Sequence, residues 1–537
     1  MTDLLSREQT QDHSLPDGWM AASLQELGEI NPRFGKDELS EDLEVTFLPM
    51  KCVEEVSGKI DASNSRHVSE VRKGYTPFQE EDIIFAKITP CMENGKMAVA
   101  RGLKNGVGFG SSEFHVVRPH ESISRDFLFY FLVRSAFRKD AERKMTGSAG
   151  QRRVPTTYIK EATVPLPPLN EQRRIVEKIE ELFTKLDAGV RSLEQARAQL
   201  KSYRRSVLKS AVEGELSREW REAQEGELEP ASELLDRILQ ERREKWELEE
   251  FAKMKAKGKV PKNDKWKKKY KEPAAPELSG LPYLPDLPRE WSWVSVGQLT
   301  WSVKDGPHYS PTYVEEGIPF VTGGNVRPNG VDFDRAKRIT PELHAELQRR
   351  CRPEKDDILY TKGGTTGIAR VNTYDIEFNV WVHVAVLKLV DTNSVKPFYM
   401  QHALNSPLCY AQSQKYTHGV GNQDLGLTRM VKIGFPLPPT QEQKWIKDEI
   451  ERCLSVVDKL EATVEENLKQ AAGLRQSILK QAFSGELVPQ DPDDEPARVL
   501  LARIRSEREA TKQKTGKKRR SKTAPSKGGH ADQGGLF

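Results

Sequence analysis

Apolar residues fall at alternating three- and four-residue steps in two long stretches of the chain, one after Asn170 and one after Thr440. This spacing holds for about four heptads in each stretch and is typical of the a/d seam of a coiled coil. At about 1.5 Å per residue, such a helix reaches roughly 65 Å and overhangs an ordinary domain. The alternative is an amphipathic helix that lies along a globular core. We predict a seam that consists of Ile175, Ile179, Leu182, Leu186, Leu193, Leu200, Ile446, Ile450, Val457, Leu460, Val464, Leu474 and Ile478.

The two stretches are copies of one sequence. Residues 165–216 align without a gap with residues 436–487 and are identical at roughly 20 of about 52 positions, which marks an internal repeat. Each copy opens on Pro-Leu-Pro-Pro, and these prolines keep the chain extended because proline cannot sit inside a helix. Each copy then reads Glu-Gln and ends on Gly-Glu-Leu. In the second copy, Thr440 and Gln443 form a capping box at the predicted helix start.

The repeat extends upstream of both helices. Residues 15–19 match residues 287–291, and residues 82–87 resemble residues 357–362, while the sequences between these anchors differ strongly. We therefore expect two globular domains of mixed strand and helix, with a shared frame and different interiors.

Local patterns predict several elements inside these domains. Residues 124–144 are expected to form one helix with Ser124 as its cap. Residues 378–389 are dense in β-branched and aromatic side chains and are expected to form one largely buried strand. His383, within that strand, is expected to be an interior histidine whose hydrogen bonds are satisfied.

A second, shorter helix is expected after each long one, because Glu229-Pro-Ala is echoed by Glu495-Pro-Ala. Residues 253–271 carry ten lysines and one acid, and residues 512–522 are also basic. Both segments are predicted to be solvated linker or tail, with contact to DNA phosphates as the alternative. The predicted domains are an N-terminal extension (1–14), domain one (15–168), a coiled-coil helix (169–216), a short helix with a Lys-rich linker (217–286), domain two (287–439), a second coiled-coil helix (440–487), a short helix (488–510) and a basic disordered tail (511–537).

Composition narrows the class of protein. The 537 residues allow two to four domains, and the formal net charge is only +4, so any basic surface has to be local. No apolar run approaches the 18 or so residues of a membrane span, and the first residues lack the layout of a signal peptide. The five cysteines are odd in number and show no C-x-x-C, which suits a reducing compartment. We expect a cytoplasmic protein.

The sequence shows no constellation that predicts catalysis. It contains no G-x-x-x-x-G-K-[ST] phosphate loop, and its ten histidines lack zinc-ligand spacing. Asn31-Pro-Arg-Phe34 is superficially like the Asn-Pro-Pro-Phe of adenine methyltransferases, but Arg33 stands in place of a proline and no cofactor loop accompanies it. Two domains of this size without catalytic residues indicate recognition rather than reaction.

The duplicated order of a domain, Pro-Leu-Pro-Pro-x-x-Glu-Gln, a long helix and Gly-Glu-Leu resembles the DNA-specificity subunit of type I restriction–modification enzymes. Residues 86–96 and 146–155 are similar to segments of that family's target recognition domains, and residues 357–367 take this part in the second domain. Residues 421–424 depart from the Gly-Gln-Arg-Arg of residues 150–153.

The resemblance implies an α+β (mixed) fold, in which two target recognition domains are separated by long helices that pair as an antiparallel coiled coil, with an internal two-fold repeat. It also implies that each domain reads one half of a bipartite, asymmetric target in double-stranded DNA. The implied partners are two modification (methyltransferase) subunits and restriction subunits that translocate and cut DNA. S-adenosylmethionine, ATP and Mg²⁺ would then be used by those subunits, with no cofactor or metal bound by this chain.

Gln and Asn suit adenine edges, and Arg and Lys suit guanine edges, in the major groove. On that basis the expected DNA-binding residues are Lys87, Gln151, Arg152, Arg153, Lys362, Thr365, Asn422 and Gln423. Two other functions stay open: a non-catalytic coiled-coil structural adaptor, and a stand-alone enzyme.

Overall fold

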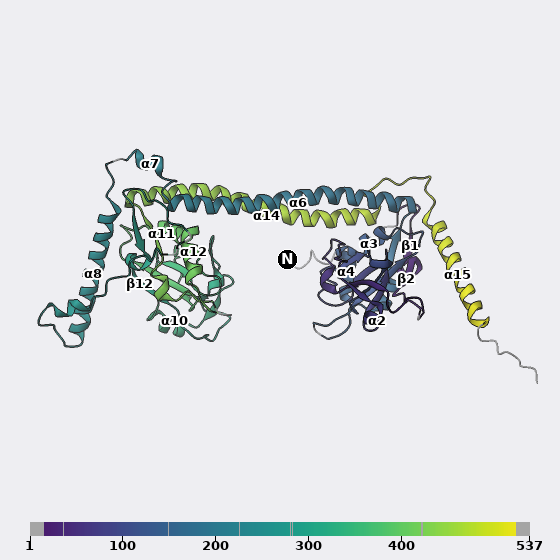
Figure 1. The fold of residues 1–537 in the computed structure, drawn as a ribbon, viewed down its shortest axis with the longest axis horizontal. Helices are drawn as coiled ribbons and strands as arrows, with labels where there is room; N and C mark the ends of the chain where they lie inside the picture. The colour runs from purple at the N-terminus through teal and green to yellow at the C-terminus, as the bar shows by residue number, and fades with distance from the viewer. Residues whose placement is uncertain are drawn as a thin grey trace, which may run out of the picture. The chain divides into compact units, whose positions relative to one another are not determined.

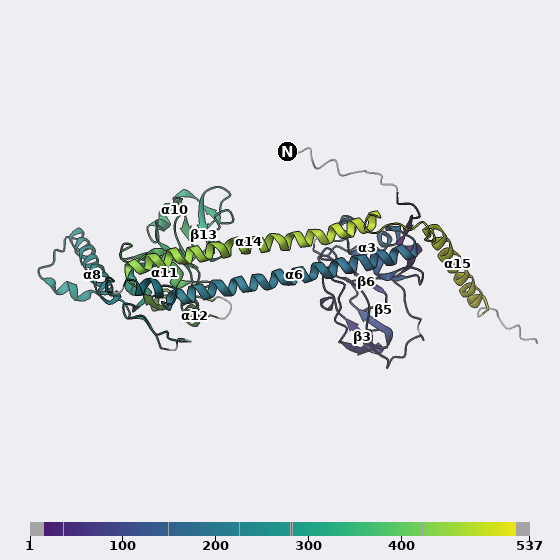
Figure 2. The ribbon, with the colours of Figure 1, turned by 90° about the horizontal axis from the view of Figure 1, so that it is seen from above.

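The computed structural model describes residues 15–35, 37–148, 150–224, 226–279, 281, 283–419 and 423–521, with side chains described as far as residue 510. The chain divides into two compact units. Unit 1 comprises Met1–Leu193 with Glu466–Phe537, and unit 2 comprises Glu194–Glu465. Two long helices, α6 (Leu169–Val212) and α14 (Thr440–Ser484), each contribute one part to either unit, and the two parts lie side by side within each unit (Figures 1 and 2).

The globular part of unit 1, here called head 1, is built on two four-stranded sheets. The first has the order β2-β9-β6-β7, with every pair antiparallel, and the second has the order β4-β3-β8-β5. The strands are β2 (Gly28–Ile30), β3 (Glu44–Leu48), β4 (Ser65–His67), β5 (Thr76–Gln79), β6 (Ile83–Ala86), β7 (Met97–Val99), β8 (Val107–Gly110) and β9 (Phe114–Pro119). A separate pair, β1 (Met20–Ser23) with β10 (Thr163–Leu166), precedes α6. The helices are α1 (Leu24–Leu27), α2 (Val68–Val71), α3 (Arg125–Val133), α4 (Ser135–Arg143) and α5 (Thr156–Glu161).

The globular part of unit 2, here called head 2, repeats this plan. Its main sheet has the order β12-β20-β17-β18, which is the order of the first sheet of head 1 in equivalent positions. The other strands form a β16-β13-β19 sheet and a β14-β15 pair, and β11 pairs with β21 ahead of α14. The main-sheet strands are β12 (Thr300–Asp305), β17 (Ile358–Thr361), β18 (Ala369–Val371) and β20 (Val384–Leu389).

The remaining strands of head 2 are β11 (Ser292–Ser295), β13 (Ile318–Val321), β14 (Val326–Arg327), β15 (Gly330–Val331), β16 (Lys337–Ile339), β19 (Asn379–Val380) and β21 (Gly434–Leu437). Its helices are α9 (Val296–Leu299), α10 (Pro341–Gln348), α11 (Pro397–Leu404), α12 (Pro407–Tyr416) and α13 (Leu427–Met430). The predicted mixed fold with an internal repeat is confirmed.

The repeated Glu-Gln pair fastens each long helix to its own head. In unit 1 the buried Glu171 accepts a hydrogen bond from the Trp19 indole at 3.0 Å. In unit 2 the buried Glu442 accepts one from the Trp291 indole at 2.8 Å. The neighbouring glutamine bonds Pro167 O in one copy and Pro438 O in the other, each at 3.0 Å. The Leu-Pro-x-x-Trp and Pro-Leu-Pro-Pro-x-x-Glu-Gln motifs therefore form one joint.

The two long helices pair in antiparallel fashion. In unit 2, Arg197 bonds Glu465 at 3.1 Å and Arg204 bonds Asp458, so seven residues forward on α6 correspond to seven residues back on α14. In unit 1 the cross-helix ion pair joins Asp187 to Arg475. Such pairs fix register and direction more than they add stability.

The predicted seam is correct at its ends and wrong at two interior positions. Ile175, Ile179, Ile446, Ile450, Val457, Val464 and Ile478 are buried, and Leu182, Leu186, Leu193 and Leu200 are half-buried. Leu460 and Leu474 remain 48% and 52% exposed. Arg204 and Arg475 occupy this stretch instead, and the Arg475 guanidinium lies 4.3 Å from the Phe183 ring centroid. Ion pairs and a cation–π contact thus replace apolar knobs there.

Several predicted boundaries also differ. The helix expected over 124–144 is broken at Arg134, whose ψ of 140° separates α3 from α4, although Ser124 does cap it. The strand expected over 378–389 is interrupted by a turn at residues 381–383. The second, shorter helix expected after α6 is α8 (Ala231–Ala256), and a further short helix, α7 (Arg218–Glu222), lies between the two. The last helix, α15 (Ala497–Ser521), extends past residue 510, where a disordered tail was predicted to begin.

Candidate nucleic-acid interface

The two heads build the same backbone frame at the end of one central strand, β6 in head 1 and β17 in head 2. Beyond these strands, Lys87 N donates to Glu113 O and Lys362 N donates to His383 O, both at 2.9 Å. A later loop returns to the same place: Val154 N donates to Lys87 O at 2.9 Å, and Leu425 N donates to Lys362 O at 2.7 Å. Each loop closes on itself by a bridge, Thr146 to Arg153 and His418 to Asp424. The predicted DNA-binding residues that the structure describes lie on or next to this frame.

In head 1 the frame carries half-buried cations and an exposed amide. Lys87 Nζ donates to Ser112 O at 2.7 Å, and its side chain is half-buried. Arg153 makes a bidentate ion pair with Glu113, at 2.9 and 2.8 Å, and this hydrogen bonding lowers the pKa of the Glu113 carboxyl. Gln151 is exposed, and Arg152 lies 3.7 Å from Glu142 in a loose contact. Gln151 and Arg152 therefore have hydrogen-bonding groups that are available to a ligand.

In head 2 the equivalent lysine is buried, contrary to its predicted role. The Lys362 side chain is 3% exposed, and Nζ lies 2.6 Å from Asp424 and 3.5 Å from Asp305. Nζ also donates to Val382 O at 3.2 Å. Two carboxylates and a carbonyl satisfy this ammonium, so Lys362 holds the frame together and does not present its charge to DNA. Thr365 and Gln423 are exposed, and Asn422 lies outside the described residues.

His383 occupies in head 2 the position that Glu113 occupies in head 1. It is half-buried in the turn after β19, with its ring edge-on to Trp381 at 4.6 Å between centroids. Its Nδ1 is buried and has no hydrogen-bond partner in the described part of the chain. Burial lowers the pKa of the imidazole, and the neighbouring Lys362 charge lowers it further. The prediction of an interior histidine with satisfied hydrogen bonds is therefore wrong.

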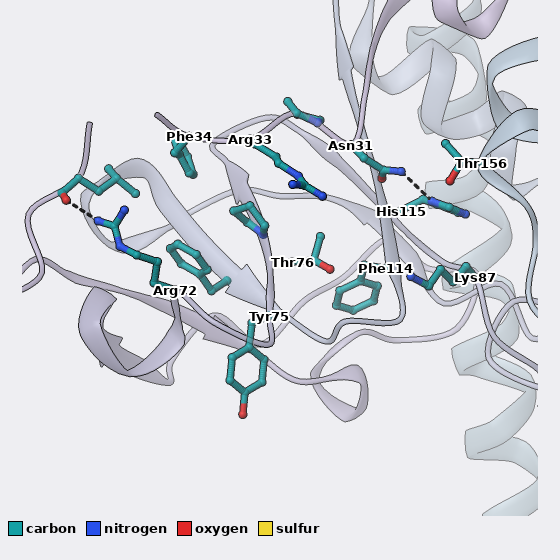
Figure 3. Close-up of a pocket in the computed structure, with 14 residues that line it drawn as sticks. Asn31, Arg33, Phe34, Arg72, Tyr75, Thr76, Lys87, Phe114, His115 and Thr156 are labelled. Atoms are coloured by element: carbon teal, nitrogen blue, oxygen red, sulfur yellow. Dashed lines mark hydrogen bonds between the residues drawn. The ribbon is translucent and has the colours of Figure 1, made fainter. Parts of the chain in front are cut away.

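A pocket of about 410 Å³ opens in head 1 beside Lys87 (Figure 3). Arg33, Phe34 and Tyr75 are among its lining residues, so cations and aromatic faces meet in one hollow. Arg33 is exposed, and no ion pair to it is present among the described residues. Sequence reasoning gave Arg33 no binding role and did not single out Tyr75, because the two residues lie 42 positions apart on different loops.

Asn31, also in this pocket, is a structural residue. Its amide nitrogen lies 3.1 Å from His115 Nδ1, and its Oδ1 accepts from Val116 N at 2.9 Å. His115 Nε2 lies 2.8 Å from Val154 O, which requires Nε2 to be the donor and leaves Nδ1 to accept from Asn31. Burial lowers the pKa of His115, consistent with this neutral tautomer. Both ends of the amide bond groups within the protein, which opposes a methyltransferase-like role for Asn31-Pro-Arg-Phe34.

The chemistry offered at both heads is hydrogen bonding and charge. Within the described ranges, no group of three or more His, Cys, Asp or Glu side chains is arranged to hold a metal ion. No helix in the described part of the chain is both long and apolar enough to cross a membrane. Amides, hydroxyls and guanidinium groups on loops suit contacts to base edges and phosphates.

Two heads of one fold, each with its own polar loops on a common frame, define a duplicated recognition protein. A family model, described as the type I restriction modification DNA specificity domain, matches residues 16–196 and 288–470. The two matches cover more than half of the chain, which therefore belongs to this family.

Known relatives agree with this assignment. The chain is 27% identical over 507 residues to the EcoAI specificity subunit of Escherichia coli, covering 85% of this chain and 81% of that protein. It is 25% identical to the EcoEI specificity subunit of Escherichia coli over the same shares of both chains. A chain from a solved type I R-M system structure, concerned with complex assembly and conformational transition, is 18% identical with a TM-score of 0.62. That alignment covers 88% of this chain and 99% of the other, and it supports the fold.

Proposed function

We propose that this chain selects the DNA sequence on which a type I restriction–modification enzyme acts, with each head reading one half of a bipartite, asymmetric target. The observation that carries the proposal is the exchange of side chains on an unchanged backbone frame. Head 1 places Glu113 and Arg153 where head 2 places His383 and Asp424. A single frame with different chemistry at its rim is what two domains need to read two different sequences.

Partners and cofactors follow from this role. The chain docks two modification subunits, which methylate adenine with S-adenosylmethionine, and restriction subunits, which use ATP and Mg²⁺. It binds none of these cofactors itself and performs no chemistry, and it acts in the cytoplasm. The support lies in family membership and in polar loops suited to binding.

The test is binding by the full chain together with its modification subunit. Duplexes that contain the target sequence, known from the methylated sites, should bind more tightly than random duplexes. For each tenfold rise in salt concentration, log K should fall by about 0.9 per phosphate contact. Equal affinity for every duplex at all salt concentrations would disprove sequence selection.

A loop variant assigns the reading to a head. Gln151→Ala combined with Arg152→Ala should relax the half-site read by head 1, at about 1–3 kcal/mol per lost bidentate base contact. Thr365→Ala in head 2 is the matched variant, and it should leave the half-site of head 1 unchanged. Relaxation of both half-sites by either variant would contradict separate reading.

The structural adaptor is the second candidate. Its seam should drive association between copies of the chain, whereas here α6 and α14 supply both sides of the pairing within each unit. Sedimentation in dilute solution distinguishes them, since the proposal predicts one copy per particle without partner subunits.

A further inference from the structure

The Lys-rich segment after α8 concentrates positive charge in an ordered hairpin. Residues 251–271 hold ten lysines against the single acid Asp264, whereas the preceding part of α8 is rich in glutamate. Two of these lysines have ion-pair partners: Lys253 contacts Glu249, and Lys267 contacts Glu247 and Asp264. The other eight are exposed and make no ion pair within the described residues: Lys255, Lys257, Lys259, Lys262, Lys265, Lys268, Lys269 and Lys271.

Aromatic stacking closes the hairpin. Trp266 stacks on Trp246 with ring centroids 5.9 Å apart, and Tyr270 lies 5.4 Å from the same Trp246 ring. Arg242 donates to the Tyr270 hydroxyl at 2.9 Å. These contacts hold the returning segment, which includes a 3₁₀ turn at Asp264–Lys269, against α8. The predicted linker is solvated, since most of its side chains are exposed, but it is folded back on the helix before it. Figure 1 shows the chain turning back beside the end of α8.

The hairpin is anchored to head 2 at its base. Arg242 Nε donates to Thr300 O at 3.2 Å, and Lys245 Nζ lies 4.8 Å from the Trp301 ring centroid. The hairpin lies outside both stretches that match the family model, 16–196 and 288–470. It is therefore an addition to the shared recognition frame, held in place by contacts of its own.

Like charges fixed close together repel one another and destabilise a fold unless a counter-charge is bound. Here stacked tryptophans hold unpaired ammonium groups in one small hairpin, which indicates an anionic partner of high charge density. The Trp266 and Tyr270 rings are engaged with Trp246, so they are not free platforms for unstacked bases. Lysine is a point-charge binder of phosphate and reads no base sequence by itself.

We propose that the hairpin of residues 251–271 binds the phosphate backbone of double-stranded DNA without regard to sequence. It adds affinity to the complex and leaves the choice of sequence to the heads. The proposal goes beyond selection of the target, because it concerns binding to all DNA.

The test replaces six of these unpaired lysines by glutamine in the full chain, assembled with its modification subunit; the six are Lys257, Lys259, Lys262, Lys265, Lys268 and Lys269. The probe is a fluorescent random-sequence duplex titrated at several salt concentrations. If about three phosphate contacts are lost, the slope of log K against log salt should fall by about 2.7, and affinity near 0.15 M salt should fall roughly a hundredfold. The ratio of target to random affinity should stay constant.

The matched control replaces the same six lysines by arginine, which keeps the charge and should keep the slope. Trp266→Ala, which loosens the hairpin and retains every lysine, should weaken random-duplex binding less than the glutamine variant. Hydrogen exchange of head 2 shows whether either change disturbs its fold.

An unchanged slope in the glutamine variant overturns the proposal, and so does a loss confined to the target duplex. Unchanged DNA binding with weakened binding of the restriction subunit would also overturn it and assign the hairpin to a protein partner. Failure of the proposed function would be distinguishable from all of these results, because the unaltered chain would then show no preference for its target over random duplex.

Discussion

Glutamine in place of Glu442 should destabilise unit 2 far more than glutamine in place of Glu171 destabilises unit 1, although the repeat makes the two positions equivalent. Glu442 is fully buried and accepts from Trp291 Nε1 at 2.8 Å, Ser217 Oγ at 2.7 Å and Arg221 Nη1 at 2.6 Å. Arg221 itself is only 14% exposed. Glu442→Gln removes the counter-charge and turns an NH₂ group toward existing donors.

Glu171 has a weaker set of partners. One oxygen accepts from Trp19 at 3.0 Å, and the other is buried with no partner among the described residues. Arg174 pairs with Asp494 at 2.8 Å instead. Burial raises the pKa of Glu171 above its ordinary 4.5, so the ionised carboxylate is disfavoured in the folded state.

Leaving a buried cation unpaired costs about 3–5 kcal/mol, which is the expected effect of Glu442→Gln. Glu171→Gln keeps the acceptor for Trp19 and should change the free energy of unfolding by about 1 kcal/mol or less. The pKa of Glu171 lies above 4.5 in the folded protein. The native state therefore loses stability as the pH rises from 4.5 through the folded-state pKa, because the buried carboxyl must then ionise. Glu171→Gln should abolish that loss.

Hydrogen exchange read by mass spectrometry resolves the two units and is the appropriate assay, because a two-unit chain need not unfold in one step. Protection of the first turns of α14 and α6 should fall sharply in Glu442→Gln and little in Glu171→Gln. Equal effects at the two positions would refute the assignment of stability to the Arg221 ion pair.

Three further changes test other parts of the structure. Val457→Asp buries a charge at a seam position that is 1% exposed, and it should lower the free energy of urea unfolding by about 3 kcal/mol or more. Leu460→Asp, at a position that is 48% exposed, should lower it by less than about 1 kcal/mol. Equal costs would contradict the observed seam. Lys362→Met removes the buried ammonium that bonds Asp424 and Val382 O, and it should cost about 1–3 kcal/mol in unfolding, with Asp305 still paired to Arg350. Lys87→Met should cost little in unfolding and instead weaken DNA binding; the opposite pattern would refute the two roles. One heptad added to both α6 and α14 lengthens each helix by about 10 Å. The unread spacer in the target should then lengthen by about three base pairs, at roughly 3.4 Å each. Methylation mapping measures the spacing, and an unchanged spacer would contradict this role of the helices.

Sequence patterns predicted the parts of this fold that depend on local or repeated chemistry. The internal repeat gave the two heads and the two long helices, because duplicated prolines and capping residues act within a few positions of themselves. It also pointed to Glu171 and Glu442 and to the repeated tryptophans, although not to the hydrogen bonds that join them across about 150 positions. The break at Arg134 was missed because its side chain packs over Phe131 and over Phe483, which is distant in sequence.

The candidate site was harder to predict because its electrostatics are long-range. Lys87 and Lys362 occupy the same frame position, yet Lys362 is buried by Asp305, which comes from β12, and Asp424, which comes from the loop. No sequence pattern near Lys362 predicts that Asp305 and Asp424 will contact it. The lysine hairpin was taken for linker because its order depends on Trp246, on the facing helix. The charge density alone favoured a solvated linker, whereas the stacking of Trp246, Trp266 and Tyr270 folds the segment back against α8.

The most direct test of the central claim is a map of methylated adenines in cells that express this chain with its modification subunit as the only methyltransferase. The account predicts methylation at one asymmetric motif made of two unlike halves separated by a fixed unread spacer. Exchange of residues 287–439 for the same region of a relative should then alter one half alone. A contiguous motif, a palindrome, or an exchange that alters both halves would contradict it.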